Sequence, residues 1–181
     1  SETKVIPIFP LDLVLFPNQD LPLRIFEPRY KQMIDDCMLG EKEFGVCLGH
    51  DNDTLSNWQA PYNIGTIAKI VDCKDVDSTS GHLFINVRGR RKFRIIRMIS
   101  PSLKKTDDYD PFTLHGAKTI EQLHHADGVG KKMYIRAEIE MISEIDESIS
   151  LVDWENLVDL WKNKIKKSTG NSDLTSHQLD H

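Results

Sequence analysis

The feature that most constrains the fold is a long alternation of apolar and polar residues that runs, with interruptions, from Ile64 to Ile99. A turn at Ser78 to Gly81 divides it, and every second residue from Leu83 to Val87 is apolar, as in a strand with one buried face. Gly89 then breaks the alternation, which resumes at Phe93. Because a glycine within a strand commonly marks a bulge or a sharp bend, we predict a strongly curved sheet at this point.

The preceding residues predict two strands and a helix. Lys4 to Phe9 is a short β-prone run, and Leu21 to Ile25 alternates after a turn. Pro28 suits the first turn of a helix, where its missing N–H costs nothing. Gly40 is expected to end this helix in the left-handed conformation. Apolar residues recur between them with the spacing of one helical face, at Tyr30, Met33, Ile34, Cys37 and Met38.

The next segments predict a strand, a loop and an insertion. Phe44 to Leu48 alternates, whereas His50 to Pro61 is rich in Asp and Asn and is interpreted as an exposed loop. Ser100 to Lys132 is polar and punctuated by Pro and Gly, with a short helix predicted at Lys118 to His125. Because this segment has few apolar residues, we expect an insertion that is mobile or only lightly docked.

The C-terminal part predicts one more strand and a final helix. Met133 to Ile142 has strand character, and Ser150 with Asp153 forms a capping-box pattern. The helix that follows is expected to pack on the β core through an apolar stripe of Trp154, Leu157, Val158, Trp161 and Ile165.

These elements predict a single α+β domain, mainly β, with one hydrophobic core. A chain of 181 residues, 39% of them apolar, is long enough to bury such a core, and two full domains would be crowded. The domain is expected to cover residues 4–168. It divides into a β core at 4–99 and 133–146, an insertion at 100–132, and a C-terminal helix at 151–167, followed by a disordered tail at 169–181.

The composition of the chain limits the cellular location and the binding partners that can be expected for the protein. Lys and Arg number 23 against 28 Asp and Glu, and the net charge of -5 excludes a surface that attracts polyanions everywhere. The three cysteines stand alone within apolar stretches, which favours buried, reduced thiols. No basic start precedes a long apolar run, and no apolar run reaches the roughly 18 residues of a membrane-spanning helix. We therefore predict a cytoplasmic protein that does not associate with membranes.

The motifs of common catalytic and cofactor sites are absent from the sequence. Gly128 to Lys132 is the nearest approach to a phosphate-binding loop, but the earlier glycine is missing and Lys132 replaces the hydroxyl that binds magnesium. The adjacent His124 and His125 would point about 100° apart on a helix, which does not suit a shared metal. We predict no catalytic residue, no metal and no cofactor.

One charged cluster lies within ten positions around Gly89. Strand alternation is expected to send part of these charges to each face, which favours a solvated edge that discourages pairing with other sheets. The alternative is an RNA-binding module that uses Arg88, Arg90, Arg91 and Arg94. The complete cluster consists of these four residues with Lys92 and Arg97.

Three segments, in this order and spacing, are specific to one known family. Ile6 to Ile34 contains an opening strand, a proline-bounded loop, a second strand and a first helix. Ile64 to Ile70 contains a strand with a Gly-Thr pair, and Asn86 to Ile95 is a glycine-centred hairpin. Together they resemble the amino-terminal, substrate-binding domain of the Lon protease. The form of Pro22 to Tyr30 is closer to free-standing Lon-domain proteins and to the matching domain of cereblon. The resemblance implies a PUA-like β pseudo-barrel with a first helix packed on it and a C-terminal helix.

The resemblance also implies a function without catalysis. The expected module carries neither the ATPase nor the peptidase of Lon, and recognises unfolded or extended polypeptide for degradation or quality control. A separate protease or an adaptor is a further expected partner. The polypeptide groove is expected beside the first helix, at Leu13, Val14, Phe16, Arg24, Phe26 and Tyr30. The alternative is that the apolar residues before the first helix form no groove and only close the end of the barrel.

Overall fold

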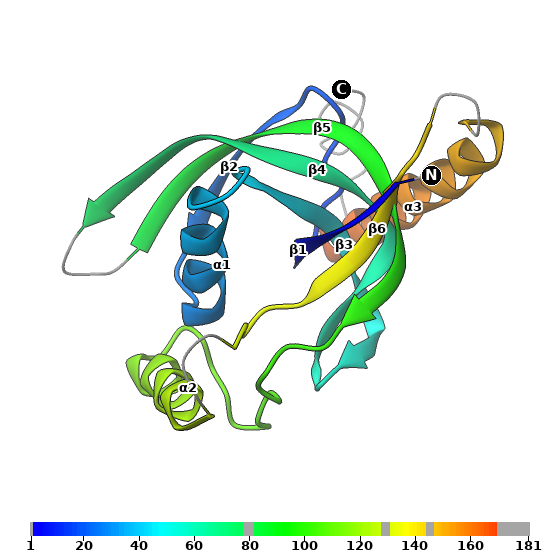
Figure 1. Cartoon of the computed structure of the whole chain (residues 1–181). Coiled ribbons are helices and arrows are strands. Elements are labelled where there is room, and N and C mark those ends of the chain that lie inside the picture. Colours follow the sequence, from blue (N-terminus) through cyan, green and yellow to red (C-terminus); the bar gives the residue numbers. More distant parts are fainter. Residues whose placement is uncertain (1, 78–81, 128–130, 144–146, 170–181) are drawn as a thin grey trace.

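The computed structural model describes residues 2–77, 82–127, 131–143 and 147–169 (Figure 1). The predicted turn at Ser78 to Gly81 and the predicted tail beyond residue 169 lie outside these residues. The strands are β1 (Thr3–Leu11), β2 (Asp20–Ile25), β3 (Glu43–Leu55), β4 (Trp58–Asp77), β5 (His82–Ile99) and β6 (Arg136–Met141). The helices are α1 (Pro28–Met38), α2 (Leu114–Asp127) and α3 (Glu147–Thr169).

The strands form one sheet that closes on itself. Their order is β2-β5-β4-β3-β1-β6, and β6 pairs in turn with β5, so all strands except β2 belong to a closed ring. β1 and β3 are parallel, whereas the other neighbours are antiparallel. In Figure 1, β4 and β5 are the long curved strands of this ring. The predicted mainly β pseudo-barrel is confirmed.

The ring closes because β5 bends at Gly89. Before the bend, residues from Leu83 to Arg88 pair with β2, and after it residues from Phe93 to Ile99 pair with β6. Ala68 of β4 lies opposite Gly89 and Thr66 lies opposite Lys92, so two residues of β5 face one residue of β4 between these pairs. This two-to-one pairing is a β-bulge, which increases bending and twist. The bend predicted from the glycine is confirmed.

Gly89 lies against the loop between β1 and β2. A Cβ atom at this position would overlap the carbonyl oxygen of Phe16. The Asn18 N–H donates to the carbonyl oxygen of Gly89, and the Gly89 N–H donates to that of Gln19, each at 2.8 Å. Only a residue without a side chain lets the two backbones approach this closely.

The loop predicted at His50 to Pro61 is wrong. β3 continues to Leu55, β4 begins at Trp58, and these two residues are paired across a tight hairpin. Ser56 and Asn57 form its turn with φ values of 52° and 66°. Positive φ at both central residues is typical of a type I′ turn, whose twist matches that of paired strands. The polar composition was interpreted wrongly as a loop. Residues 51–54 are exposed on both faces of the hairpin, so these strands do not need alternating apolar residues.

Helix α1 begins at Pro28, as predicted, and buries Tyr30, Met33, Ile34 and Cys37 in the main core cluster. The prediction for its end is wrong, because the left-handed residue is Lys42, with a φ of 60°, and Gly40 does not adopt that conformation. The Lys42 N–H donates to the Cys37 carbonyl at 2.9 Å and so turns the chain into β3.

Helix α3 packs on the β core, as the sequence predicted. Trp154 contacts Phe16 edge-on, with ring centroids 5.7 Å apart and planes at 86°. Helix α3 begins at Glu147, earlier than the predicted 151, and ends near the predicted boundary. The apolar stripe of α3 includes Trp154, Leu157 and Trp161. These side chains cover Val14, Leu48 and Ile64 of the β core, and the six residues form one buried cluster.

The insertion is anchored more firmly than its composition suggests. Leu103, Ile120 and Met133 are buried together with Trp58. The Trp58 indole Nε1–H donates to the Leu103 carbonyl at 2.8 Å. Helix α2 is also longer than the predicted Lys118 to His125. A few apolar residues suffice because one aromatic side chain at the start of β4 provides both an apolar face and a donor.

Replacing Gly89 with alanine is expected to destabilise the fold by about 2 kcal/mol or more, since the added Cβ pushes the Phe16 loop away from β5. Gly40→Ala is the matched control, because the atom nearest to its Cβ would be 3.8 Å away. Urea denaturation followed by circular dichroism measures both. Equal unfolding midpoints would show that the close approach at Gly89 is unimportant.

Replacing Trp161 with alanine is expected to cost about 3 to 5 kcal/mol of unfolding free energy, as for other large buried aromatics. Leu160→Ala, at the neighbouring exposed position, is expected to cost less than about 1 kcal/mol. Thermal and urea melts of the two variants measure the difference. A silent Trp161→Ala would mean that α3 does not contribute to the cooperative core.

Candidate functional site

The predicted polypeptide-binding residues fall into two separate sets. Leu13, Val14 and Phe16 lie in the cluster that α3 covers, so they support that helix. For them the structure agrees with the alternative interpretation, in which these residues close the barrel end. Arg24 and Phe26 lie together on a different surface, at the end of β2 and before α1.

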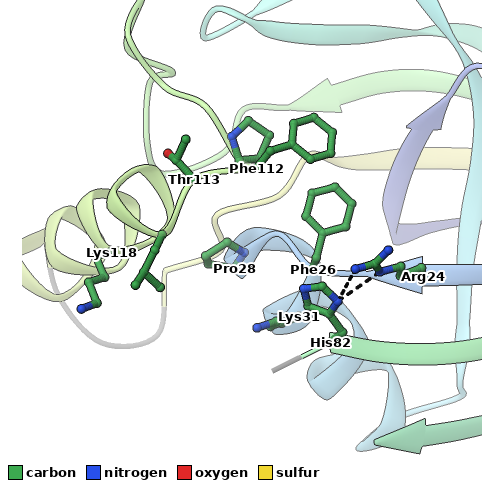
Figure 2. A pocket seen from close by; sticks show the side chains of 10 residues that line it. Arg24, Phe26, Pro28, Lys31, His82, Phe112, Thr113 and Lys118 are labelled. Atoms are coloured by element: carbon green, nitrogen blue, oxygen red, sulfur yellow. Dashed lines mark hydrogen bonds between the residues drawn. The ribbon is translucent and has the colours of Figure 1, made fainter. Parts of the chain in front are cut away.

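A recess of about 410 Å³ opens beside Phe26, and we call it the aromatic recess (Figure 2). The rings of Phe26 and Phe112 pack against each other in its wall, with centroids 5.1 Å apart. Phe112 and Leu114 are 81% and 72% exposed, which is unusual for large apolar side chains gathered in one place. The lining residues are Arg24, Phe26, Pro28, Lys31, His82, Pro111, Phe112, Thr113, Leu114 and Lys118.

The charge of the aromatic recess is positive, whereas the net charge of the chain is -5. Arg24, Lys31 and Lys118 line it, and its lining contains no Asp or Glu. Arg24 Nε donates to His82 Nδ1 at 3.0 Å (Figure 2). The bond fixes the guanidinium within the lining of the recess.

A second recess of about 270 Å³ adjoins the first, and we call it the arginine recess. It shares Arg24 and Phe26 with the aromatic recess. Its other lining residues are Phe9, Pro10, Leu11, Asp12, Leu23, Ile25, Glu27, Arg29, Tyr30 and Gln59.

Arg29 is the buried charge of the arginine recess, with only 8% of its surface exposed. Its guanidinium lies between two rings, with Cζ 4.2 Å from the centroid of Tyr30 and 3.9 Å from that of Trp58. Its Nε donates to Glu27 Oε2 at 2.9 Å. Stacking of a cation on two aromatic faces with a carboxylate at its edge fixes the plane of the guanidinium.

Two tyrosines complete this environment. Tyr30 stacks on Phe9, with ring centroids 4.1 Å apart, and burial raises the pKa of its phenol to about 12. Tyr109, from the insertion, donates from its hydroxyl to Glu27 Oε2 at 3.5 Å. Burial and the negative charge of Glu27 raise the pKa of Tyr109. Both phenols therefore remain protonated at neutral pH and act as packing and hydrogen-bonding groups.

The basic cluster of β5 lies on the outer face of the barrel. The buried positions of this strand include Val87, Gly89 and Phe93, so the expectation that alternation divides the charges between both faces is wrong. The bulge is the physical reason, because it turns both Arg90 and Arg91 outward.

Most of these charges already have partners. Arg88 lies 3.5 Å from Asp20, Arg94 lies 3.4 Å from Asp153, and Lys92 Nζ lies 4.7 Å from the ring centroid of Trp154. Arg97 is paired similarly with Glu138 at 3.3 Å. Arg90 and Arg91 remain exposed without an acidic partner among the described residues. A ring does not neutralise a charge, so within the described part of the chain the cluster offers three charges without an acidic partner, those of Arg90, Arg91 and Lys92, and not six.

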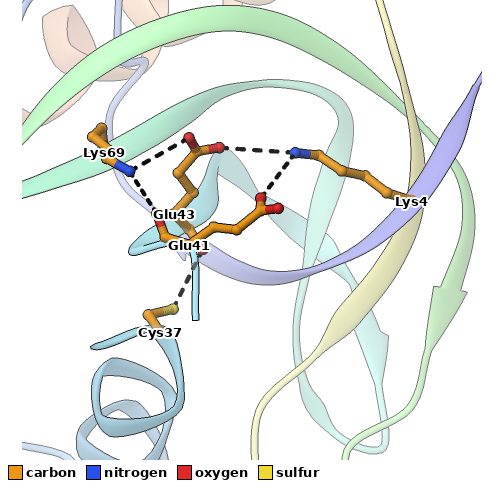
Figure 3. Close-up of polar contacts among 5 residues, drawn as sticks. All are labelled: Lys4, Cys37, Glu41, Glu43 and Lys69. Carbon is orange, nitrogen blue, oxygen red and sulfur yellow. Dashed lines mark hydrogen bonds and ion pairs between the residues drawn. The ribbon is translucent and has the colours of Figure 1, made fainter. Parts of the chain in front are cut away.

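The buried cysteines are not activated nucleophiles. The Cys37 thiol donates to the Glu43 carbonyl at 3.4 Å, and burial raises its pKa to about 12 (Figure 3). Burial also raises the pKa of Cys47. Both therefore remain thiols near neutral pH. The partly exposed ion pairs around Cys37 contribute little to stability and join Lys4 to Glu41 and Glu43, and Lys69 to Glu43.

The described residues form neither a metal site nor a membrane-spanning helix. No group of three or more His, Cys, Asp or Glu side chains is placed to hold a metal ion. No described helix has the length and apolar character needed to cross a membrane.

Comparison with known proteins identifies the fold family. A family model for the substrate-binding domain of the ATP-dependent protease La (LON) matches residues 5–180. The chain belongs to this Lon substrate-binding domain family. The predicted family is therefore confirmed, and the matched region is the substrate-binding domain alone.

Two solved structures are similar to the chain. A Lon N-terminal domain protein from Xanthomonas campestris is 27% identical, with a TM-score of 0.50 over 77% of this chain and 60% of that chain. The N-terminal domain of a Mycobacterium avium complex Lon protease is 14% identical, with a TM-score of 0.47 over 98% of this chain and 77% of that chain. The chain thus spans less than two thirds of the Xanthomonas protein.

Sequence reasoning missed the residues that complete the two recesses. Phe112 and Lys118 come from the insertion and His82 begins β5. Trp58, which begins β4, lines neither recess but covers Arg29. The one available signal was an aromatic residue, Phe112, next to a proline within a polar segment. Its position beside Phe26 depends on tertiary docking that no local pattern encodes.

Iodoacetamide at pH 8 is expected to modify the half-buried Cys73 before Cys37 and Cys47. The reason is that burial shields the latter two and raises their pKa values, which leaves little thiolate. Mass spectrometry of peptides from native and urea-unfolded protein measures the order. Faster modification of Cys47 than of Cys73 in the native protein would contradict the burial described above.

Proposed function

We propose that the chain is a non-catalytic module that binds extended polypeptide across the aromatic recess and the arginine recess. The observation that carries this proposal is that the two recesses adjoin and share Arg24 and Phe26. Membership of a substrate-binding domain family supports it independently. Three of the six residues predicted for a polypeptide groove, Arg24, Phe26 and Tyr30, line the arginine recess.

The chemistry of the surface suits a polypeptide. Phe26, Phe112 and Leu114 offer an exposed apolar area, and burying one large apolar side chain against it would contribute about 1.5 to 3 kcal/mol. Arg24 and Lys31 add donors at the rim for carbonyl and carboxylate oxygens. A ligand with alternating apolar and polar groups, as in an extended chain, fits this combination.

RNA binding through Arg88, Arg90, Arg91 and Arg94 is the alternative function. Phosphate binding requires several uncompensated cations, and here two of the four have acidic neighbours within 3.5 Å. Exposed aromatic rings on which bases stack are also concentrated at the other surface, around Phe26. These observations favour polypeptide over RNA.

We further propose that the bound polypeptide is delivered to a separate protease or adaptor in the cytoplasm. The support is that the matching family model describes the substrate-binding domain of an ATP-dependent protease. Affinity purification from native cells, with Phe26→Ala protein as the control, tests this. Recovery of the same proteins by both baits would contradict delivery through these recesses.

The polypeptide proposal is tested with a fluorescein-labelled protein that reduction and carboxymethylation keep unfolded. Fluorescence anisotropy is expected to show binding that weakens about tenfold when Phe26 and Phe112 are both replaced by alanine, because two apolar contacts are lost. Ile96→Ala is the control, since this exposed residue of β5 lines neither recess.

A charge-reversal variant separates the two functions. Arg90→Glu with Arg91→Glu is expected to leave polypeptide binding unchanged, since both residues lie at the bulge and outside the recesses. Titration with a structured RNA at low salt is run in parallel. Salt-sensitive RNA binding that this variant abolishes, together with no effect of the two phenylalanine replacements, would overturn the proposal in favour of RNA.

A further inference from the structure

Arg29 has hydrogen-bond donors that the protein leaves unused. A guanidinium has five N–H donors, and the Nε–H is bonded to Glu27. No described residue accepts a hydrogen bond from either Nη group, although the residue is 92% buried, being 8% exposed. Buried polar groups nearly always have partners, so two unused NH2 groups at this depth call for a ligand or water.

The surroundings of Arg29 leave one direction open. Tyr30 covers one face of the guanidinium and Trp58 covers another, at 4.2 and 3.9 Å from Cζ to the ring centroids. Glu27 occupies the Nε edge. Arg29 lines the arginine recess, and its unpaired Nη groups are not fully enclosed by protein atoms. A ligand in the recess therefore reaches the Nη edge of the guanidinium.

The charges around this edge favour an anion. Two acidic residues line the arginine recess, and both already have cationic partners: Glu27 is bonded to Arg29, and Asp12 lies 3.1 Å from Lys164. Arg24 adds a further cation, which is bonded to His82 and has no ion pair with a described acidic residue. A carboxylate entering the recess therefore meets Arg24 and the Nη edge of Arg29.

Size limits what accompanies the carboxylate. A volume of about 270 Å³ lies below the usual range for drug-sized ligands, roughly 300–1,000 Å³, so it suits one residue better than a continuous segment. Leu23, Phe9 and Phe26 provide an apolar wall for a side chain. Parallel N–H donors of arginine match the two oxygens of a carboxylate.

We infer that the arginine recess binds the C-terminal carboxylate of an extended polypeptide, whose last, apolar side chain packs against Phe26. This inference rests on the proposed polypeptide binding and specifies the part of the substrate that is recognised. It assigns to Arg29 the role of carboxylate receptor and to Arg24 that of a second cation at the entrance.

Three related peptides, the first two of identical sequence, test the inference from the ligand side. The first ends in leucine with a free carboxylate, the second has the same end amidated, and the third is amidated but carries an internal Glu. Calorimetry with the whole chain is expected to show the free acid binding about tenfold more tightly than both amides, from one charge-assisted contact. Equal binding of acid and amide overturns the inference, and equal binding of the third peptide overturns the chain-end assignment.

The unfolded-protein probe separates this inference from the proposed function. If that probe binds while the free acid shows no advantage, carboxylate recognition is wrong and polypeptide binding stands. If neither the probe nor any peptide binds, both proposals are wrong.

Protein variants locate the carboxylate. Arg29→Lys keeps the charge but loses the planar pair of donors, so the roughly tenfold preference for the acid over the amide is expected to shrink to the part that Arg24 and the remaining charge contribute. Arg88→Gln, at an exposed arginine outside both recesses, is the control and is expected to keep the full preference. Retention of the full preference in folded Arg29→Lys protein would overturn the assignment.

Because Arg29 is buried, its variant is first checked by thermal melting. If it does not fold, Arg24→Gln carries the test, since Arg24 is exposed and its replacement leaves Glu27 paired. This variant is expected to weaken binding of the free acid several-fold while leaving the amide unchanged. Equal weakening of both peptides would overturn the role of a cation in recognising the chain end.

Discussion

The close approach of Gly89 to the backbone of Phe16 is the contact on which the rest of the structure depends. It permits β5 to bend, and the bend lets one strand pair with β2 before it and with β6 after it, which closes the ring. It also holds the loop before β2 in place, and the Thr66 hydroxyl secures the same loop by donating to the Leu15 carbonyl at 2.6 Å. The loop in turn provides Phe16 to α3, so barrel closure and helix docking share one origin.

Local patterns predicted the elements whose cause is local. A glycine in a strand, a proline at a helix start and an apolar stripe each act through neighbouring residues, and Gly89, Pro28 and the α3 stripe were interpreted correctly. The hairpin at residues 50–61 was missed because its strands gain stability from pairing rather than from a buried face. The anchoring of the insertion was missed because Trp58 and Leu103 are 45 residues apart in sequence.

For the candidate site, sequence alone left two roles open for apolar residues near the first helix. A binding groove and a closed barrel end both require leucine, valine and phenylalanine side chains at these positions. Only the position of α3 shows which of these side chains are covered. It covers Val14 and leaves Phe26 beside a recess. The charged part of the site was equally ambiguous in the sequence. The arginines of β5 form a recognisable cluster, whereas Arg29 is a single charged residue at the start of a helix. An exposed arginine that is paired with an acid contributes little. A buried arginine acts where water is scarce and its interactions are stronger.

Trp58 connects the insertion to Arg29 of the arginine recess. Its ring covers one face of Arg29, and the same side chain donates to Leu103 and packs against Ile120 in the insertion. Tyr109 extends this link, because it contacts the Trp58 ring edge-on at 5.2 Å and bonds Glu27, the partner of Arg29. The insertion thus contributes Phe112 to the wall of one recess and, through Trp58, fixes the cation of the other. Under the proposed function, changes in the insertion are expected to alter both recesses together while the closed ring of strands remains the same, so this segment would set substrate preference.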